Sequence, residues 1–456
     1  MTGSGMTRSG MTGTGTTSYW CEQAWLPAGP VARVQLVVEA GSFLSVTAGV
    51  EPDPADERLP GLVLPGFANV HAHAFHRALR GRTHDEGGTF WTWRQRMYEV
   101  AARLDPDSYL RLATATYAEM ALAGVTAVGE FHYLHHGPGG RRYDDPNAMG
   151  AALIQAADDA GVRLTLLDTC YLAGGLTPSG HTEPDAVQAR FCDGTAAAWA
   201  DRMAAIPGRP GLLVGAAIHS VRAVPADQIA VVAAVAAGRP LHVHLSEQPA
   251  ENEACQAFYG CSPAALLNRS GALGPATTAV HATHLSVEDI GLLGRSRTAV
   301  CACPSTEADL ADGIGPFAAL SAAGARLCLG TDQQAHTDLL AEAGRLENDA
   351  RLASGQRGRF EPPFLVNALA PQGQSALGWP DAGQLAVGQR ADLVAVALDT
   401  VRTAGALPSQ VVMVAGAADV RTVIRDGQVV VRDGQHRLGR VGELLAAAIE
   451  PLWADT

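Results

Sequence analysis

Two histidines, His71 and His73, end an apolar run that begins at Leu62. Side chains alternate along an extended strand, so a His-x-His pair directs both imidazoles to the same side. Two neutral imidazoles so close together form half of a metal site. Such a pair also arises by chance, and each ring is then a core histidine bonded to a backbone carbonyl. The rest of the chain therefore decides whether the pair binds a metal.

A second His-x-His pair, His242 and His244, is followed by Glu247. A water activated by a metal needs a carboxylate nearby that takes its proton and hands it on. This spacing predicts His244 as a metal ligand and Glu247 as the proton shuttle. His242 faces the same side and is the alternative ligand; otherwise it fills the interior.

A carboxylate, Asp332, follows Gly330 at the end of another apolar run. Three imidazoles and one carboxylate leave a position for water, as in an open catalytic zinc site. The chain contains no lysine, so all 33 basic residues are arginine. A carbamylated lysine that bridges two metals is therefore excluded. We expect one divalent metal, zinc by its ligand set, with iron and manganese as alternatives.

Apolar runs of strand-like composition alternate with longer segments of helical period. The eight runs lie at residues 62–73, 125–131, 164–171, 213–219, 241–245, 278–281, 299–303 and 326–332. Helices are expected between them at 106–123, 149–160, 225–237, 286–293, 307–323 and 339–353. Eight such units predict an α/β fold, a (β/α)8 TIM-like barrel with its chemistry at the carboxyl ends of the strands. His219 and His281 end two further runs at that rim.

The two ends of the chain are rich in strands and turns. We expect a disordered tail at 1–18 and the first part of a small β-sandwich domain at 19–64. The metal-dependent barrel is expected at 65–380, and the rest of the sandwich with a terminal helix at 381–456. Because they flank an α/β centre, the two β-rich ends are expected to pack together as one domain.

The composition excludes several classes of partner. A net charge of −13 and a pI near 5.6 argue against nucleic acid and anionic membranes. No apolar run reaches the roughly 18 residues that span a bilayer. Eight scattered cysteines predict reduced thiols and a cytoplasmic protein. A homodimer is expected because symmetric dimers are common.

A further cluster of histidines, His132, His135 and His136, predicts a polar loop rather than a second metal site.

Together these motifs resemble the amidohydrolase superfamily, in particular its deaminase and iminohydrolase branch. The resemblance covers about residues 60 to 430 and rests on segments 65–73, 244–247, 280–284, 330–332 and 388–394. It implies that the metal ligands are His71, His73, His244 and Asp332. It also implies that Glu247 moves protons, and that His281 polarises or positions the attacked group. We further expect Asp332 to help Glu247 deprotonate the water.

Further segments are similar to the formimidoylglutamate deiminase subfamily of that branch, namely residues 73–78, 90–98, 130–136, 219–224 and 303–310. This resemblance implies a small acidic substrate held by His76, Arg94, Tyr133, His219 and Arg222. N-formimino-L-glutamate carries two carboxylates, and the planar fork of arginine pairs with a carboxylate through two hydrogen bonds. A general basic surface could not supply that geometry.

Two positions depart from the usual pattern of this subfamily. His76 stands where glutamine is common, and Gln333-Gln334 stand where a Ser-His pair is common. These changes leave the deiminase class intact. They bear on the support of the metal-binding carboxylate and on the choice of substrate.

The expected reaction is metal-dependent hydrolytic deimination of N-formimino-L-glutamate to N-formyl-L-glutamate and ammonia, a step of histidine degradation. One alternative is a deaminase of another small amidine or of a nucleobase. A base would need aromatic stacking and amide contacts in place of two arginines. The other alternative is a non-catalytic binding protein that retains the metal, and the intact Glu247 and His281 argue against it.

Overall fold

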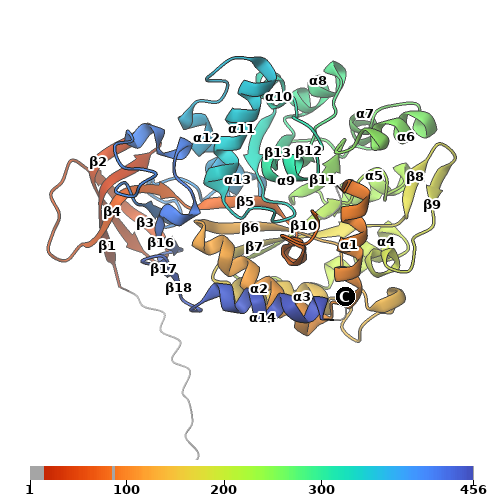
Figure 1. Cartoon of the computed structure of the whole chain (residues 1–456), viewed down its shortest axis with the longest axis horizontal. Coiled ribbons are helices and arrows are strands. Elements are labelled where there is room, and N and C mark those ends of the chain that lie inside the picture. The colour runs from red at the N-terminus through yellow and green to blue at the C-terminus, as the bar shows by residue number, and fades with distance from the viewer. Residues whose placement is uncertain (1–14, 85–87, 455–456) are drawn as a thin grey trace, which may run out of the picture.

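Eight parallel strands form the centre of the molecule in the computed structural model, which describes residues 15–84 and 88–454 (Figure 1). Their order around the sheet follows the chain: β5 (Phe67–Ala72), β6 (Val125–His132), β7 (Arg163–Cys170), β10 (Leu212–Ile218), β11 (Leu241–Leu245), β12 (Thr277–His281), β13 (Ala299–Ala302) and β14 (Arg326–Leu329). Each of these strands corresponds to a predicted run, so the (β/α)8 barrel is confirmed.

The barrel closes between its first and last strands, just beyond β14. The backbone N–H groups of Thr331 and Asp332 donate to the His71 carbonyl at 3.1 and 2.9 Å, and the His73 N–H donates to the Asp332 carbonyl at 3.1 Å. Gly330 permits this approach, because a Cβ there would lie 2.8 Å from the His71 oxygen. The closure brings residues 71–73 next to residue 332.

The first predicted strand is divided in two. The run at 62–73 contributes to β4 (Glu57–Pro65) in a second sheet and forms β5 in the barrel. The chain changes sheet at Gly66, whose N–H donates to the Asp392 carbonyl at 3.0 Å. A Cβ at this position would lie 2.4 Å from Thr126 Oγ1, so the crossing needs glycine. The continuous hydrophobicity of the run hides this break.

Helices cover the outside of the barrel (Figure 1). Five predicted helices are present as α2 (Pro106–Leu122), α3 (Ala148–Ala160), α5 (Ala226–Val235), α8 (Val287–Ser296) and α11 (Leu339–Ser354). The helix predicted at 307–323 is two short ones, α9 (Pro304–Asp309) and α10 (Phe317–Ala322), because Gly313, Gly315 and Pro316 interrupt it. The helices not predicted are α1 (Phe90–Arg103), α4 (Ala196–Ala204), α6 (Pro249–Tyr259), α7 (Pro263–Arg269), α12 (Pro362–Leu369) and α13 (Pro371–Ala376).

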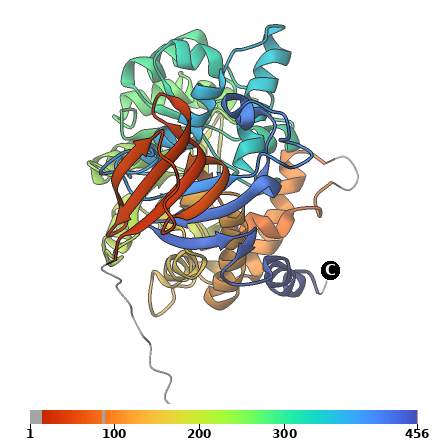
Figure 2. The ribbon, with the colours of Figure 1, turned by 90° about the vertical axis from the view of Figure 1, so that its left-hand side faces the viewer.

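Strands from both ends of the chain form the second sheet beside the barrel (Figure 2). Their order is β18 (Gln435–His436), β17 (Gln428–Arg432), β16 (Val420–Arg425), β15 (Leu393–Val396), β4, β1 (Thr17–Leu26), β2 (Gly29–Glu39) and β3 (Ser42–Ala48). Side chains of both ends, among them Leu36, Phe43, Leu393 and Ile424, build a hydrophobic core of their own. The expected union of the two β-rich ends is confirmed, and the terminal helix α14 (Val441–Ile449) follows it.

Strand β1 begins at Thr17 and therefore includes the last two residues of the segment 1–18, which the sequence predicts as a disordered tail. Thr17 and Ser18 pair with Val38 and Val37 of β2, so their backbones extend the antiparallel ladder. Their small polar side chains gave no sign of this pairing. Residues 1–14 of the expected tail lie outside the described residues.

A buried ion pair joins the barrel to the second sheet. Arg163, at the start of β7, contacts both carboxylate oxygens of Asp392, which precedes β15; Nη1 donates to Oδ1 at 2.9 Å. Both side chains are fully buried, and the same oxygen accepts the Asp426 N–H at 2.9 Å. A buried charge left without its partner is costly. The pair therefore fixes how the two sheets meet.

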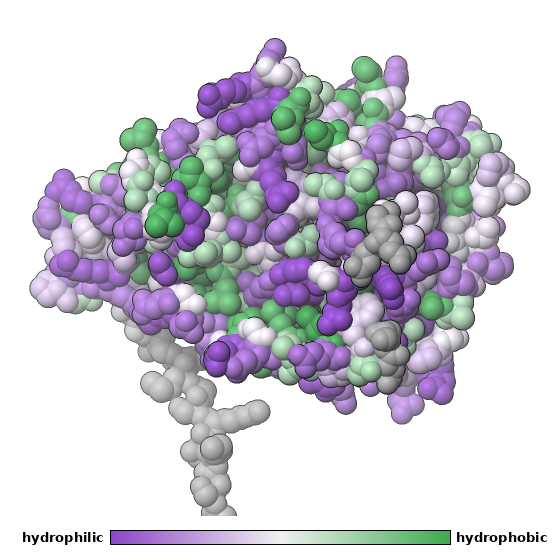
Figure 3. All heavy atoms as spheres, viewed as in Figure 1, coloured by the Kyte–Doolittle hydropathy of each residue, from purple (hydrophilic) through white to green (hydrophobic). Residues whose placement is uncertain are grey.

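Hydrophilic and hydrophobic residues are interspersed on the face of the molecule shown in Figure 3. Within residues 15–84 and 88–454, no helix is long and apolar enough to cross a membrane. The longest helix of that part, α2, has 17 residues, whereas a bilayer core needs about 20.

We expect Asp392→Ala to destabilise the fold strongly, because the buried Arg163 would lose the carboxylate that contacts both of its Nη atoms and keep only Asp426 Oδ1, 3.1 Å from Nη1, as a counter-charge. The free energy of unfolding, measured by chemical denaturation, should fall by about 3–5 kcal/mol. Glu57→Ala is the matched control, since Glu57 belongs to the same sheet and pairs with Arg432 at 2.7 Å on the surface. It should cost less than about 1 kcal/mol. Equal losses in both variants would contradict the role of the buried pair.

Candidate active site

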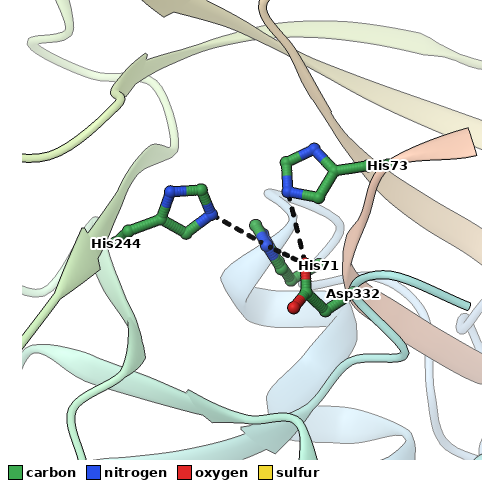
Figure 4. Close-up of side chains that lie close together, drawn as sticks. All are labelled: His71, His73, His244 and Asp332. Carbon is green, nitrogen blue, oxygen red and sulfur yellow. Dashed lines mark hydrogen bonds and ion pairs between the residues drawn. The ribbon is translucent and has the colours of Figure 1, made fainter. Parts of the chain in front are cut away.

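Four side chains from three parts of the barrel converge on one point (Figure 4). His71 lies in β5 and His73 just after it, His244 lies in β11, and Asp332 follows β14. His71 Nε2 lies 3.1 Å from His244 Nε2 and 3.2 Å from Asp332 Oδ1, and His73 Nε2 lies 3.3 Å from the same oxygen. All four are buried, and one donor atom of each lies within 4.8 Å of the others. Such a group can hold a metal ion.

Backbone geometry fixes the direction of these donors. His71 and His73 point the same way because they are two residues apart in extended chain. His73 Nδ1 lies 2.9 Å from the Phe131 carbonyl, so His73 Nε2 faces the group. Asp332 has a φ of 43°, a left-handed conformation that costs free energy in a non-glycine residue and is common at functional sites. Its backbone bonds to His71 and His73 hold it there.

Burial sets protonation states that suit metal binding. It lowers the pKa of His71 to about 3 and the pKa of His244 well below its usual value, so both rings are neutral at pH 7. Burial raises the pKa of Asp332, but hydrogen bonds from His71 and His73 outweigh it and hold that pKa well below its usual value. Neutral imidazoles and an ionised carboxylate are the ligand forms, so this donor set fits a divalent cation.

The structure brings His244, and not the alternative His242, into this group. His242 lies two residues earlier in the strand, where its Nε2 is 3.4 Å from the Ala376 carbonyl. Burial lowers the pKa of His242 to about 4, so it is a neutral core histidine. The alternation that places both rings on one side of the strand could not tell which of them reaches the rim.

Glu247 and His281 lie beside the four-residue group. Glu247 Oε1 is 3.7 Å from His281 Nε2, and that nitrogen is 3.8 Å from Asp332 Oδ2. Across the ring, His281 Nδ1 is 3.4 Å from Glu307 Oε1, which also accepts the Cys303 N–H at 2.9 Å. Burial lowers the pKa of His281, but Glu247 and Glu307 raise it well above its usual value. His281 can therefore offer a proton to a bound group.

One cavity opens onto Glu247, His281 and the metal-binding group, of which His73, His244 and Asp332 line it. Its lining also includes all five side chains predicted to hold the substrate, which are His76, Arg94, Tyr133, His219 and Arg222. Aromatic side chains make up much of the remaining wall, namely Phe90, Trp91, Trp93, Tyr98, Tyr171 and Phe191. The predicted catalytic and substrate-binding residues thus surround one space.

Arg94 reaches this cavity from α1. Its guanidinium lies 4.7 Å from the centre of the Trp91 ring and 5.5 Å from that of Tyr98. Stacking of this kind holds the planar group in place. In the described part of the chain, no carboxylate pairs with Arg94. Its donors are therefore free to bind an anionic ligand.

His76, Tyr133 and His219 form a connected wall. His76 Nε2 lies 2.9 Å from the Tyr133 hydroxyl, and the Tyr133 and His219 rings are 5.5 Å apart. Burial lowers the pKa of both His76 and His219 well below its usual value. The two neutral rings offer hydrogen bonds to a ligand without adding charge.

Arg222 is less free than its place in the sequence suggests. Its Nε lies 3.0 Å from Glu251 Oε2, and its Nη2 lies 3.5 Å from Glu247 Oε2. Glu251 is buried in the first turn of α6 and is not among the predicted site residues. Pro249 marks the start of that helix, and a glutamate at the third helical position can reach back to the preceding turn. That spacing was the signal that could have found it.

The unusual Gln333-Gln334 pair supports Asp332 from outside the cavity. Gln334 Nε2 donates to the Asp332 carbonyl at 2.9 Å, and its Oε1 accepts from Thr331 Oγ1 at 2.7 Å. Gln333 Nε2 donates to Asp309 Oδ2 at 2.8 Å. Neither glutamine lines the cavity, so the pair acts on the turn that carries Asp332.

A second group of histidines has a different environment. His132, His135 and His136 are all buried, and the first two lie near Asp168. Arg202 already binds both oxygens of Asp168, at 2.8 and 2.9 Å. A cation would have to compete with that bidentate pair, which supports the expectation of no second metal site here.

The chain matches known proteins over most of its length. Residues 62–430 match the Amidohydrolase family. Formimidoylglutamate deiminase of Pseudomonas aeruginosa is 38% identical over 442 residues, 92% of this chain and 96% of that protein. The 8-oxoguanine deaminase of the same organism is 32% identical, over 81% of this chain and 83% of that protein. The crystal structure of an amidohydrolase from Brucella melitensis has a TM-score of 0.89 at 30% identity, over 96% of this chain and 99% of that one.

The matched range contains every feature of the site described above. It begins in β4, includes all eight barrel strands, and ends in β17. The His-x-His pair at the end of β5 and the carboxylate after β14 lie inside it, as do Glu247 and His281. This chain is therefore a member of the amidohydrolase family.

Proposed function

We propose that this chain hydrolyses N-formimino-L-glutamate to N-formyl-L-glutamate and ammonia, a step of histidine degradation. The observation that carries the proposal is one cavity shared by the metal-binding group, the Glu247–His281 pair and the unpaired guanidinium of Arg94. Hydrolysis of a linear amidine that bears carboxylates requires all three. The similarity to a formimidoylglutamate deiminase supports this choice of substrate.

Zinc is the proposed ion, held by His71, His73, His244 and Asp332. Three imidazoles and one carboxylate make a donor set that suits catalytic zinc, while iron and manganese accept similar ligands. When bound, the ion supplies a water that can attack at neutral pH and a positive charge beside the reacting carbon.

The side chains around the ion then move protons. Glu247, with Asp332, takes the proton of the attacking water as the water oxygen bonds to the formimino carbon. His281 donates a hydrogen bond that polarises the amidine. Glu247 passes that proton to the imine nitrogen, which becomes an amino group on a tetrahedral carbon. The proton of the new hydroxyl then reaches the same nitrogen through Glu247, the C–N bond breaks as the carbonyl forms, and ammonia leaves. The oxygen of the new formyl group comes from the water.

Substrate recognition rests on the two arginines and the neutral wall. Arg94 offers two parallel N–H donors of its stacked guanidinium to one carboxylate, and Arg222 has Nη1 available for the other. His76, Tyr133 and His219 complete the enclosure with neutral hydrogen-bonding groups. The glutamine-to-histidine difference at His76 keeps a polar contact with Tyr133, which is compatible with the same substrate.

The second candidate is deamination of a nucleobase. The similarity to an 8-oxoguanine deaminase and the aromatic cavity wall favour it. A base would stack on rings such as Trp93 or Tyr133 and would make little use of Arg94 and Arg222. Glutamine substitutions of the two arginines separate the candidates, because they should spare turnover of a base.

Three further proposals concern the chain as a whole. We place the boundaries between the β-rich ends and the barrel at residues 64 and 380, supported by the separate core that the terminal strands share. We propose a homodimer, which light scattering would test, and a protein that binds neither nucleic acid nor membrane. A cytoplasmic location is proposed because all eight cysteines are free thiols.

Glu247→Gln should remove the proton shuttle and leave the metal in place. We expect kcat for ammonia release from N-formimino-L-glutamate to fall by about 10²–10⁴-fold, the range of general acid–base catalysis. Elemental analysis should find the same metal content as in the parent protein. Glu253→Gln, at an exposed position two residues after Glu251 in α6, is the control and should keep full activity. Full activity of Glu247→Gln would exclude the proposed shuttle.

Removal of the metal by a chelator should abolish ammonia release, and added zinc should restore it. His244→Ala should lower the bound metal below one ion per chain, because one of the four donors is lost. His84→Ala, which changes a largely exposed ring, should leave the metal content unchanged. Normal metal content in His244→Ala would contradict the ligand assignment.

Arg94→Gln should weaken substrate binding by removing a charged pair with a carboxylate. We expect KM to rise by about 10–100-fold, the size of a lost hydrogen bond to a charged group, with a smaller change in kcat. Arg96→Gln is the control, since Arg96 lies on the exposed side of the same helix and pairs with Glu99 at 3.1 Å. An unchanged KM in Arg94→Gln would favour a substrate without a carboxylate at this position.

A further inference from the structure

One guanidinium, that of Arg222, lies between two carboxylates at the edge of the cavity. Its Nε is 3.0 Å from Glu251 Oε2 and its Nη2 is 3.5 Å from Glu247 Oε2. Among the described residues, no side chain pairs with Nη1. All three residues line the cavity. The proton shuttle of the proposed reaction is therefore bound to a group that is also proposed to receive the substrate.

Glu251 has no assigned role in the reaction, yet it fixes this arrangement from two sides. Its side chain is fully buried. Its Oε1 accepts the Ser246 N–H at 3.0 Å, which holds the turn just before Glu247, while its Oε2 holds Arg222. Ser246 has a φ of 51°, a left-handed conformation that costs free energy in a non-glycine residue. The turn therefore needs support such as this hydrogen bond to Glu251. Glu251 thus sets the distance between Arg222 and Glu247.

A substrate carboxylate at Nη1 would add a third negative charge around a single positive one. Glu251 is anchored by the Ser246 N–H, whereas the side-chain contacts of Glu247 within the described residues are the long ones to Arg222 and to His281, at 3.5 and 3.7 Å. Repulsion between like charges in this buried place acts on the most weakly held of the three. A bound substrate carboxylate would therefore weaken the contact between Glu247 and Arg222. Glu247 could then interact with His281 and the reacting centre.

We propose that Glu251 is a positioning residue which makes Arg222 a shared partner of the proton shuttle and of the substrate carboxylate. The inference rests on the proposed function. Without a carboxylate in the cavity, Arg222 holds Glu247 away from its proton-transfer position. When a carboxylate is bound, Arg222 pairs with the substrate and Glu247 is free to transfer protons. Discrimination against amidines without a carboxylate then lies in kcat as well as in KM.

A substrate in two pieces tests this coupling directly. N-propylformamidine carries the reacting amidine without a carboxylate, and propionate supplies the carboxylate separately. We expect the parent enzyme to turn over N-propylformamidine slowly and propionate to raise kcat by about threefold or more, because binding energy from a remote group is used in the chemical step. A separate carboxylate that only inhibits, or that changes nothing, overturns the proposal.

Arg222→Gln gives the second test, because it should change the two substrates in opposite directions. It should lower kcat/KM for N-formimino-L-glutamate by about 10-fold or more through loss of the carboxylate contact. For N-propylformamidine it should raise kcat and abolish the response to propionate, since Glu247 is no longer held. A merely structural role of Arg222 predicts a loss with both substrates, and that result overturns the proposal.

Glu251→Gln tests the positioning residue, with Glu253→Gln of the same helix as the exposed control. The amide loses the charge that anchors Arg222, so Arg222 should turn to Glu247. We expect kcat for N-formimino-L-glutamate to fall by about 10-fold with less change in KM, while circular dichroism and metal content stay those of the parent enzyme. Equal kcat in both variants overturns the role of Glu251.

Failure of this coupling differs from failure of the proposed function. Ammonia from N-formimino-L-glutamate without stimulation by propionate overturns the coupling and leaves the function standing. No ammonia from either amidine with zinc-loaded enzyme overturns the proposed function and the coupling with it.

Discussion

The hydrogen bonds between residues 71–73 and Asp332 are the constraint on which the site depends. They close the barrel between its first and last strands, and they join the two parts of the metal-binding group that are farthest apart in sequence. The donors therefore sit on hydrogen-bonded backbone rather than on loops, which is how a catalytic group is held to within a few tenths of an ångström. His244 and His281 reach the same rim because parallel strands present their carboxyl ends together.

Much of this arrangement could be predicted from the sequence, for reasons that the structure makes clear. The period of two in a strand places His71 beside His73, and parallel strands bring Glu247, His281 and Asp332 to one rim. Such rules act on the backbone alone, so they hold without knowledge of packing. They fail where packing decides. At Gly66 an unbroken apolar run changes sheets, and the position needs glycine because a Cβ there would collide with Thr126.

The contacts of charged side chains were the least predictable part. A sequence shows that Arg222 follows a strand-end histidine, but it does not show that a guanidinium is already shared by Glu247 and Glu251. A long charged side chain can reach several partners, and burial determines which of them it pairs with in the folded protein. The same holds for Gln334, whose hydrogen bonds turn a departure from the subfamily's pattern into support for the backbone of Asp332.

The balance of charges around the cavity explains how a protein of net negative charge can bind an acidic substrate. Two guanidinium groups near the cavity, Arg94 and Arg222, stand against four carboxylates, Asp332, Glu247, Glu251 and Glu307. Burial raises the pKa of a fifth acid, Asp312, to about 9, so it adds no charge at pH 7. The protonated His281 and a divalent cation together outweigh the two carboxylates in excess, and the field at Arg94 then favours an anion. Under the proposed function, the metal would therefore contribute to binding of the substrate carboxylates as well as to activation of water.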